Sequence, residues 1–352
     1  MRAERERAGT MVRVLMVRHA ESGQNMVVAR LEVETLRGRM DAKRGFKLLR
    51  RVTDTDEALT DVGLAQAEAL RDYWAPLLEP YHQSGRLHMY SSPCLRTLQT
   101  AGPLAERLGV SPVVKPEISE FPGILAPGPE RDVIFPRLMA AERKGDLEAV
   151  ARIEAEMEGR WTRHGLTRAQ IIERFPTFRM DPAINDDLPW YRYGAESQMR
   201  AKRRFQSVID WLYHLRDTLP SDHVVVLVTH GNAIRHILWG LFFGFEGEAP
   251  FRGSDNTAVN SVTLKKEADV NKLLPGAMWF TTRRINIEFL NRVDHLVAVH
   301  AMDRLSGYLH GTSPEQHHYD ADPTHDAFIA NLHEAATLPT EAARRSQLFS
   351  KL

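Results

Sequence analysis

Two histidines in this sequence stand directly at the ends of apolar segments. His19 follows Arg18 at the end of the run 12–17, and His230 follows the run 223–228. Short apolar runs of this length are typical of strands buried in a parallel sheet. Ligands of open α/β sheets bind at the carboxyl ends of the strands. If the two strands are neighbours, we expect both histidines to lie in one cleft.

Two arginines are expected to lie in the same cleft as the histidines. Arg18 precedes the first histidine, and Arg96 lies on a helix after the expected strand 87–91. The guanidinium group matches a phosphate with two parallel hydrogen bonds. A single His or Arg at a strand end is more often a structural residue. Two of each in one cleft predict phosphoryl chemistry, with one histidine as the nucleophile.

Strands and helices alternate around these residues. We expect strands at 12–17, 87–91, 113–114, 223–228, 261–264 and 284–289, and helices at 61–74, 93–108, 146–158, 197–219 and from 233. The stretch between Ser22 and Leu59 is basic, and its pattern predicts no regular element. Alternation of this kind predicts an α/β fold, with a mostly parallel central sheet flanked by helices.

Four motifs, in order, resemble those of the histidine phosphatase superfamily, which is also called phosphoglycerate mutase-like. They are Arg18-His19-Ala20-Glu21-Ser22 with Asn25; Leu59-Thr60 with Gly63, Gln66 and Ala67; Ser91-Ser92-Pro93 with Arg96, Thr97, Gln99, Thr100 and Ala101; and Val228-Thr229-His230-Gly231 with Arg235. The resemblance covers about residues 11–123 and 194–265, and it implies the phosphoglycerate mutase-like fold.

The resemblance also implies a role for each matching residue. His19 would form a phosphohistidine intermediate, while Arg18, Arg96 and His230 would bind the phosphate. A nucleophilic histidine must be neutral, so its other ring nitrogen should donate to a nearby acceptor. Ser22, Asn25 and Gly231 would add phosphate contacts.

A carboxylic acid must protonate the leaving alkoxide, which is a poor leaving group as an anion. Glu120 matches the family's acid, since Ile118-Ser119-Glu120 fits its Leu-x-Glu pattern, and Glu117 is the alternative. The resemblance implies no metal and no other cofactor.

Three functions fit these residues. The Arg-Arg-Ser-x-Asp-x-Pro-Pro-Pro pattern of true phosphoglycerate mutases is absent, which favours a phosphatase that hydrolyses a phosphomonoester. The alternatives are a mutase-type phosphotransferase and a non-catalytic phospholigand-binding or scaffold protein. The sequence leaves the substrate and the oligomeric state open.

The sequence predicts three regions. Residues 11–123 and 194–300 form the catalytic core, 124–193 an inserted helical cap, and 301–352 a C-terminal extension. Within the expected cap, Trp190 and Tyr191 either line the mouth of the site or anchor the cap.

Composition excludes several classes of partner. Lys and Arg number 46 against 46 Asp and Glu, so no chain-wide basic surface is available for nucleic acid. No apolar run approaches the ~20 residues of a membrane helix. The single Cys94 excludes a disulfide framework and is read as a small apolar filler. We therefore expect a small phosphorylated substrate. The basic stretch 36–51 either attracts that substrate or is simply solvated.

The sequence ends in Ser350-Lys351-Leu352, the tripeptide of a peroxisomal address. In a eukaryote this predicts binding to the peroxisomal import receptor and a peroxisomal location. In any other source we expect a cytoplasmic protein.

Overall fold

The computed structural model describes residues 11–38, 41, 56–124, 133–157, 165–182, 184, 188–191, 196–249, 251, 253–266 and 285–296. The basic stretch 36–51 lies largely outside these ranges. The expected extension 301–352, with Ser350, Lys351 and Leu352, lies wholly outside them. None of the described helices is long and apolar enough to cross a membrane.

A single sheet of seven strands forms the centre of the described structure, in the order β4-β3-β2-β5-β1-β6-β7. The strands are β1 (Met11–Arg18), β2 (Leu87–Ser91), β3 (Val113–Val114), β4 (Arg179–Met180), β5 (His223–Thr229), β6 (Val259–Lys265) and β7 (Ile285–Arg292). Pairing is parallel from β4 through to β1, whereas β6 and β7 are antiparallel. The predicted mostly parallel sheet is confirmed. The antiparallel edge was not predicted.

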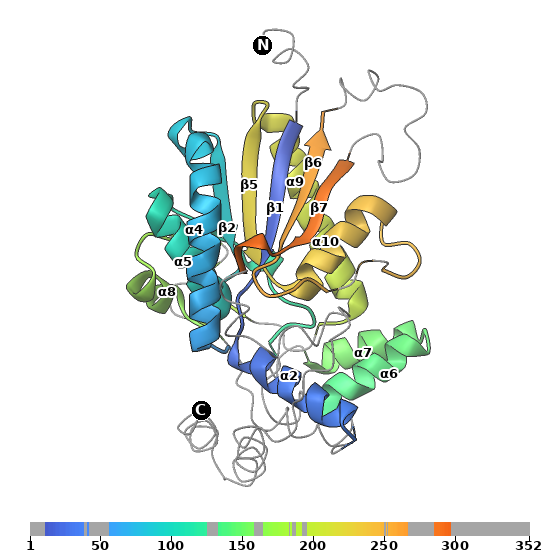
Figure 1. Cartoon of the computed structure of the whole chain (residues 1–352). Helices are drawn as coiled ribbons and strands as arrows, with labels where there is room; N and C mark the ends of the chain where they lie inside the picture. Colours follow the sequence, from blue (N-terminus) through green and yellow to red (C-terminus); the bar gives the residue numbers. More distant parts are fainter. Residues whose placement is uncertain are drawn as a thin grey trace.

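Helices cover both faces of this sheet (Figure 1). The described helices are α2 (Gly23–Leu36), α4 (Asp61–Gln83), α5 (Leu95–Leu108), α6 (Phe135–Arg143), α7 (Leu147–Met157), α8 (Arg168–Arg174), α9 (Gln198–Thr218) and α10 (Gly231–Phe243), with two 3-10 turns, η1 (Pro116–Ile118) and η3 (Asp294–Leu296). The faces of the sheet are covered by α4 and α5 on one side and by α9 and α10 on the other.

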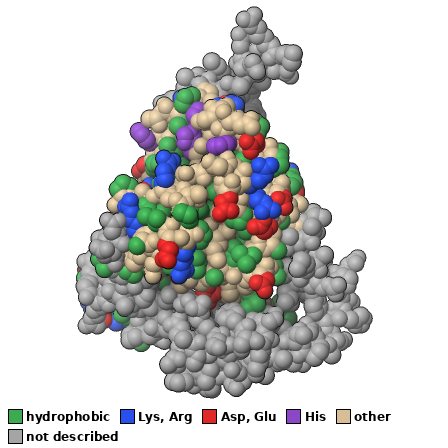
Figure 2. Space-filling model, turned by 90° about the vertical axis from the view of Figure 1, so that its left-hand side faces the viewer, with side chains coloured by type: hydrophobic (Ala, Val, Ile, Leu, Met, Phe, Trp, Pro, Cys, Tyr) green, Lys and Arg blue, Asp and Glu red, His purple; other side chains and the backbone are tan. Residues whose placement is uncertain are grey.

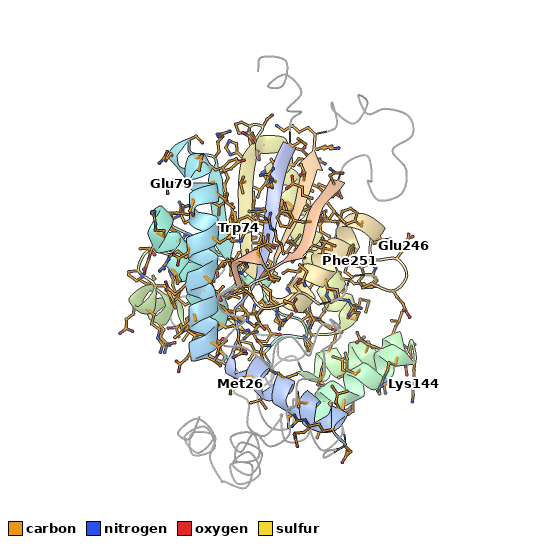
Figure 3. The ribbon with its side chains drawn as sticks, in the orientation of Figure 1. Met26, Trp74, Glu79, Lys144, Glu246 and Phe251 are labelled. Carbon is orange, nitrogen blue, oxygen red and sulfur yellow. The ribbon has the colours of Figure 1, made fainter. Side chains whose placement is uncertain are left out.

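The side-chain alternation of the central strands explains the three layers. On β1, Leu15 and Val17 pack with α4 and α5, whereas Val14 and Met16 pack with α9 and α10. Both sets are at most 3% exposed. Trp74 projects from α4 into the first of these two cores (Figure 3). Because β1 and β5 are apolar on both faces, they can only lie in the middle of such a sandwich.

The segment expected to be irregular contains a helix, α2. Ser22 caps it, accepting from the Asn25 amide, while the Asn25 side chain accepts from the Ser22 amide. Its buried apolar residues lie on two opposite sides: Val27 and Leu31 on one, and Ala29 and Val33 on the other. The helix therefore has no single apolar stripe, and the periodicity that reveals a surface helix is missing.

The range 124–193, expected as a cap, divides into two parts. The strand β4 extends the sheet beside β3, and Trp190 and Tyr191 are buried in the core that α4 and α5 share with the sheet. These two aromatic residues therefore anchor the segment. Separately, α6 and α7 form a small apolar cluster of their own around Leu138 and Ile153. In Figure 1 they lie with α2 beyond the lower end of the sheet.

Candidate active site

The carboxyl ends of β1, β5 and β2 bring the two histidines together. The strand β5 lies between β1 and β2, with Arg18 paired to Thr229 and Ser91 paired to Val228. The rings of His19 and His230 consequently meet edge to face, with centroids 5.2 Å apart. The strand adjacency required by the sequence argument is confirmed.

His19 is held as a neutral nucleophile would be. Its ring is buried, and Nδ1 lies 2.7 Å from the carbonyl oxygen of Ala20. A carbonyl can only accept, so Nδ1 carries the proton and Nε2 keeps its lone pair. Burial and the charges of Arg96 and Arg18 hold the pKa of His19 well below its ordinary value. The expected acceptor for the second ring nitrogen is the Ala20 carbonyl.

His230 carries its ring proton on the other nitrogen, Nε2 rather than Nδ1. Its Nδ1 lies 3.1 Å from Nη2 of Arg96, and its Nε2 lies 2.8 Å from Oγ of Ser92. An arginine can only donate, so Nδ1 accepts, and Nε2–H donates to the serine hydroxyl. Burial, Arg96 and His19 hold the pKa of His230 well below its ordinary value. Ser92 thereby orients the ring, a role that the sequence analysis missed.

The two arginines flank the histidines. Arg18 donates from Nη1 to the carbonyl of Ser254 at 2.5 Å, whereas its buried Nε has no hydrogen-bond partner among the described residues. Arg96 lies 4.0 Å from the carboxylate of Asp56. Burying a donor without a partner is costly. An anion bound between the arginines would satisfy the Nε of Arg18.

The two candidate acids have different environments. Glu120 accepts from the Phe121 amide at 2.9 Å, and burial raises its pKa despite the nearby charges of Arg96 and Arg18. Glu117 instead pairs with Lys115 at 3.2 Å, with its side chain 36% exposed. A carboxyl whose pKa is raised by burial suits a proton donor. These environments favour Glu120 over Glu117.

Ser22 and Asn25 fill structural places. The Ser22 hydroxyl donates to Oδ1 of Asn25 at 3.1 Å, and that oxygen also accepts from Nδ2 of Asn256 at 3.2 Å. Asn256 donates further to the His19 carbonyl at 3.0 Å. The pair thus joins α2 to the chain around His19. Phosphate contacts from Ser22 and Asn25 stay a prediction.

Gly231 opens α10, with His230 as its N-cap. The first amides of a helix have no partner within it and point toward anions. A Cβ at this position would lie 3.5 Å from Nε of Arg18, an ordinary contact. The amide of Gly231, rather than its lack of a side chain, is therefore what could serve a phosphate.

Residues of the second and third motifs fix the turn after His19. The amide of Ala20 donates to Oγ1 of Thr100 at 2.9 Å, and that of Glu21 donates to Oε1 of Gln66 at 2.8 Å. A Cβ on Gly63 would overlap the carbonyl oxygen of Glu21. Glycine at 63 therefore lets α4 approach the turn closely.

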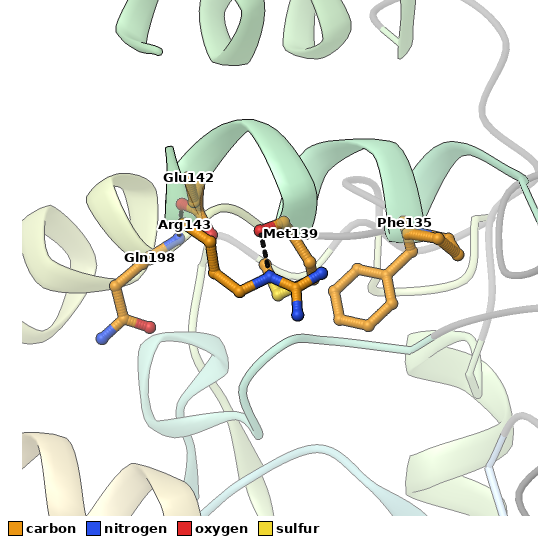
Figure 4. A pocket seen from close by; sticks show the side chains of 6 residues that line it. Phe135, Met139, Glu142, Arg143 and Gln198 are labelled. Atoms are coloured by element: carbon orange, nitrogen blue, oxygen red, sulfur yellow. Dashed lines mark hydrogen bonds between the residues drawn. The ribbon is translucent and has the colours of Figure 1, made fainter. Parts of the chain in front are cut away.

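A hollow of about 550 Å³ lies beside α6 (Figure 4). Its lining residues are Phe135, Pro136, Met139, Glu142, Arg143 and Gln198. Gln198 also lies 3.1 Å from His236, whose ring contacts that of Phe121, the residue after Glu120. Gln198, one of the lining residues, is therefore linked through His236 to Phe121, in the segment that carries the candidate acid.

Other chemistry finds less support in the described ranges. They hold no cluster of three or more His, Cys, Asp or Glu side chains suited to a metal ion. Cys94 is buried, and burial raises the pKa of its thiol to about 12. A thiol of this kind is not a nucleophile at neutral pH, in agreement with its expected role as an apolar filler.

One family model and several solved structures are similar to this chain. A family model described as the histidine phosphatase superfamily (branch 1) matches residues 14–126 and 137–274. No curated protein matches. Similar solved structures include a mycobacterial glucosyl-3-phosphoglycerate phosphatase, with 18% identity, 79% of this chain and 98% of that chain covered, and a TM-score of 0.40.

Two further solved structures are similar at the same level. A phosphoserine phosphatase mutant from Entamoeba histolytica, in complex with phosphoserine, has 15% identity, covers 81% of this chain and 100% of its own, and has a TM-score of 0.40. A phosphoglycerate mutase from Bacillus anthracis has 14% identity, coverage of 84% and 99%, and a TM-score of 0.43.

Proposed function

Because this chain belongs to the histidine phosphatase superfamily, branch 1, we propose that it hydrolyses a phosphomonoester through a phosphohistidine on His19. One observation carries the proposal: the buried rings of His19 and His230 lie 5.2 Å apart, beside Arg18 and Arg96. Two neutral imidazoles and two cations suit a dianionic phosphate that is attacked by nitrogen.

In the first step, the lone pair on Nε2 of His19 forms a bond to phosphorus while the bond to the ester oxygen breaks. Glu120 gives its proton to that oxygen, and the neutral alcohol leaves. Arg18 and Arg96 neutralise the oxygens of the phosphoryl group during transfer. The raised pKa of Glu120 supports its role as the acid, since burial favours the protonated form.

In the second step, the Glu120 carboxylate takes a proton from water. The water oxygen bonds to phosphorus, the bond to Nε2 breaks, and its electron pair returns to the ring. Inorganic phosphate leaves, and Glu120 is again protonated. The sum is ester plus water giving alcohol plus phosphate, and no step uses a metal ion.

The hollow beside α6 supports an inference about the alcohol part of the substrate. The leaving oxygen must lie next to the acid, so the rest of the alcohol extends past Glu120. For an alcohol part long enough to reach this hollow, Phe135 and Met139 would offer apolar contacts, and Arg143 would offer a positive charge. We infer a substrate whose alcohol part carries an apolar group or a second anionic group. Phe135→Ala should raise KM for such substrates; an unchanged KM for every ester tested would contradict the inference.

A release assay tests the function. The full chain is offered sugar phosphates, phosphoglycolate-like acids, nucleotides, lipid phosphates and phosphopeptides, and both alcohol and inorganic phosphate are measured. Hydrolysis yields the two in equal amounts, is inhibited by vanadate and persists in EDTA. Transfer to a second alcohol without free phosphate would indicate a mutase-type phosphotransferase instead. Phosphate binding without turnover of any ester would indicate a binding protein.

A further inference from the structure

Residues 117–122, here called the acid segment, accept five hydrogen bonds through their main-chain carbonyls. The contacts are Arg204 Nη1 to the carbonyls of Glu117 and Ser119 at 2.7 and 3.0 Å, Thr229 Oγ1 to Ile118 at 2.5 Å, Asn232 Nδ2 to Phe121 at 3.2 Å, and the Glu196 amide to Pro122 at 2.8 Å. All of the donors come from β5, α10, α9 or the residues just before α9. The acid segment is therefore held against the elements that carry and support His230.

Arg204 is the centre of this arrangement. While Nη1 donates to two carbonyls, Nε and Nη2 donate to both carboxylate oxygens of Glu196, at 2.8 and 2.5 Å. Only a planar guanidinium group, with its five N–H donors, can bind the two carbonyls and the carboxylate at the same time. The amide of Glu196 also donates to the carbonyl oxygen of Pro122. The ion pair thus contacts the segment before and after Glu120.

We propose that the Arg204–Glu196 pair positions Glu120 as the proton donor to the leaving oxygen. The inference rests on the proposed function, in which Glu120 is the acid. A proton donor must come within about 2.6–3.2 Å of its acceptor. A displacement of about 1 Å can cost about 100-fold in rate. Arg204 acts through the backbone and is a positioning residue.

Leaving-group dependence separates positioning from simple support of the fold. An alkyl phosphate needs protonation of its leaving oxygen, whereas a p-nitrophenyl phosphate needs little. The ratio of kcat/KM for the alkyl ester to that for the aryl ester does not depend on how much of a preparation is active. The later hydrolysis of the phosphohistidine also does not contribute to this ratio. Loss of folded protein leaves this ratio unchanged, but a misplaced acid lowers it.

Three variants test the pair. Glu120→Gln should lower the ratio by about 100-fold or more, since it removes the acid. Arg204→Lys keeps the charge but cannot serve both carbonyls and a carboxylate, so we expect a drop of about 10-fold. Glu196→Gln keeps the shape of the side chain and should give a smaller drop in the same direction. It also serves as the test if Arg204→Lys does not fold.

Arg216 provides the matched control on the same helix. It donates from Nε and Nη2 to both oxygens of Asp217 and is similarly shielded, with its side chain 11% exposed against 18% for Arg204. Its carboxylate partner is the next residue in the chain, and it lies more than three helical turns beyond Arg204 on α9. Arg216→Lys should therefore leave the ratio at the wild-type value.

The outcomes can be told apart. If Glu120→Gln lowers the ratio but both pair variants keep the wild-type ratio, while their two kcat/KM values fall together, the pair only supports the fold and the inference is wrong. If Glu120→Gln itself leaves the ratio unchanged, the acid in the proposed function is wrong. A drop in Arg216→Lys equal to that in Arg204→Lys would also overturn the inference.

Discussion

At the scale of single residues, burial moves the pKa values of the site in opposite directions. It lowers the pKa of His19 and His230, aided by Arg96, and it raises the pKa of Glu120. Burial therefore favours neutral His19 and protonated Glu120, the forms that the proposed nucleophile and the proposed acid require. Burial acts on both groups in the same way, because it disfavours the charged form of each: the protonated histidine and the ionised glutamate.

Removal of the proposed nucleophile, His19, should stop turnover. We expect His19→Ala to lower kcat for p-nitrophenyl phosphate by at least about 1,000-fold, because the proposed phosphohistidine forms on the His19 ring. Phosphate release measures the loss, and circular dichroism checks that the variant is folded. Substantial activity in a folded His19→Ala protein would remove His19 from the nucleophile role.

The shifted pKa values also predict the pH profile. Attack needs neutral His19, whose lowered pKa keeps it neutral below the ordinary histidine value of about 6.5. Protonation of an alkyl leaving group needs un-ionised Glu120, whose raised pKa extends that form above the ordinary glutamate value of about 4.3. The kcat/KM for an alkyl phosphate should therefore peak on the acidic side of neutrality.

The falling alkaline limb of that profile belongs to Glu120. The charged groups facing its carboxyl are Arg96, Arg18 and Arg204, which oppose the effect of burial. Glu120→Gln has no proton to lose, so its profile should lack the alkaline limb and lie lower. A limb that persists unchanged in Glu120→Gln would assign it to another group.

Some residues of the candidate site could be located from the sequence, and others could not. The location of Arg18, His19 and His230 could be predicted because each stands at the end of a strand, where topology alone fixes the position. Ser92 and Arg204 act through contacts made by chain segments far apart in sequence. Arg204, for example, meets Glu117 only because α9 packs beside η1. No local spacing signals such a contact.

At the scale of elements, close approach between α4 and the turn after His19 sets the shape of the site. Thr60 caps α4 and accepts from the Gly63 amide, and its own amide donates to the Glu21 carbonyl at 3.0 Å. The start of the helix is thus bound to the turn that follows the nucleophile. This explains why the motif around 59–67 accompanies the histidine motif.

Gly63 and Gly102 make a pair with opposite predictions. A Cβ at 63 would overlap the Glu21 carbonyl, whereas a Cβ at 102, inside α5, meets nothing within 4 Å. Gly63→Ala should displace the turn, lowering kcat/KM by about 10-fold or more. Gly102→Ala should leave activity intact and stabilise the protein by about 0.5–1 kcal/mol, since alanine favours helix.

Steady-state kinetics and urea unfolding of the two variants check this prediction. The two changes add the same methyl group to helices on the same face of the sheet, so a general effect of the substitution would appear in both. Equal activity in Gly63→Ala and wild type would show that the turn can move without cost to the site.

The helix α2 and the direction of the strand β6 were not predicted, each for a physical reason. The helix α2 buries residues on two opposite sides, so it lacks the apolar stripe on which prediction depends. The strand β6 is a buried run like those of a parallel sheet, and a run of this kind does not reveal its direction. Direction is set by pairing, here antiparallel to β1.

At the scale of the whole molecule, histidines are placed at both ends of the sheet. His19 and His230 follow the carboxyl ends of their strands. At the opposite end, on β2 and β5, Nε2 of His88 lies 2.9 Å from Nδ1 of His223, and burial lowers both pKa values. Figure 2 shows histidine side chains gathered near the upper end of one face. The folded protein thus resists protonation at both ends.

This resistance predicts a loss of stability in acid. Where a folded-state pKa lies below the unfolded value, the unfolded chain binds more protons, so the free energy of unfolding falls as pH falls below about 6.5. A histidine that is still neutral at pH 5.5 costs about 1.4 kcal/mol relative to pH 7.5. His19 and His230, both buried and with strongly lowered pKa values, should together cost about 2–3 kcal/mol.

Urea unfolding at pH 7.5 and 5.5, followed by tryptophan fluorescence, measures this difference. Glu120, with its raised pKa, acts in the opposite direction, so the histidine contribution is isolated by comparison with the double variant His19→Asn/His230→Asn. In that variant two groups no longer titrate, and the stability difference between the two pH values should shrink by about 2–3 kcal/mol. An equal difference in wild type and double variant would show that these histidines protonate as readily in the folded protein as in the unfolded chain, and that the site does not hold its nucleophile neutral.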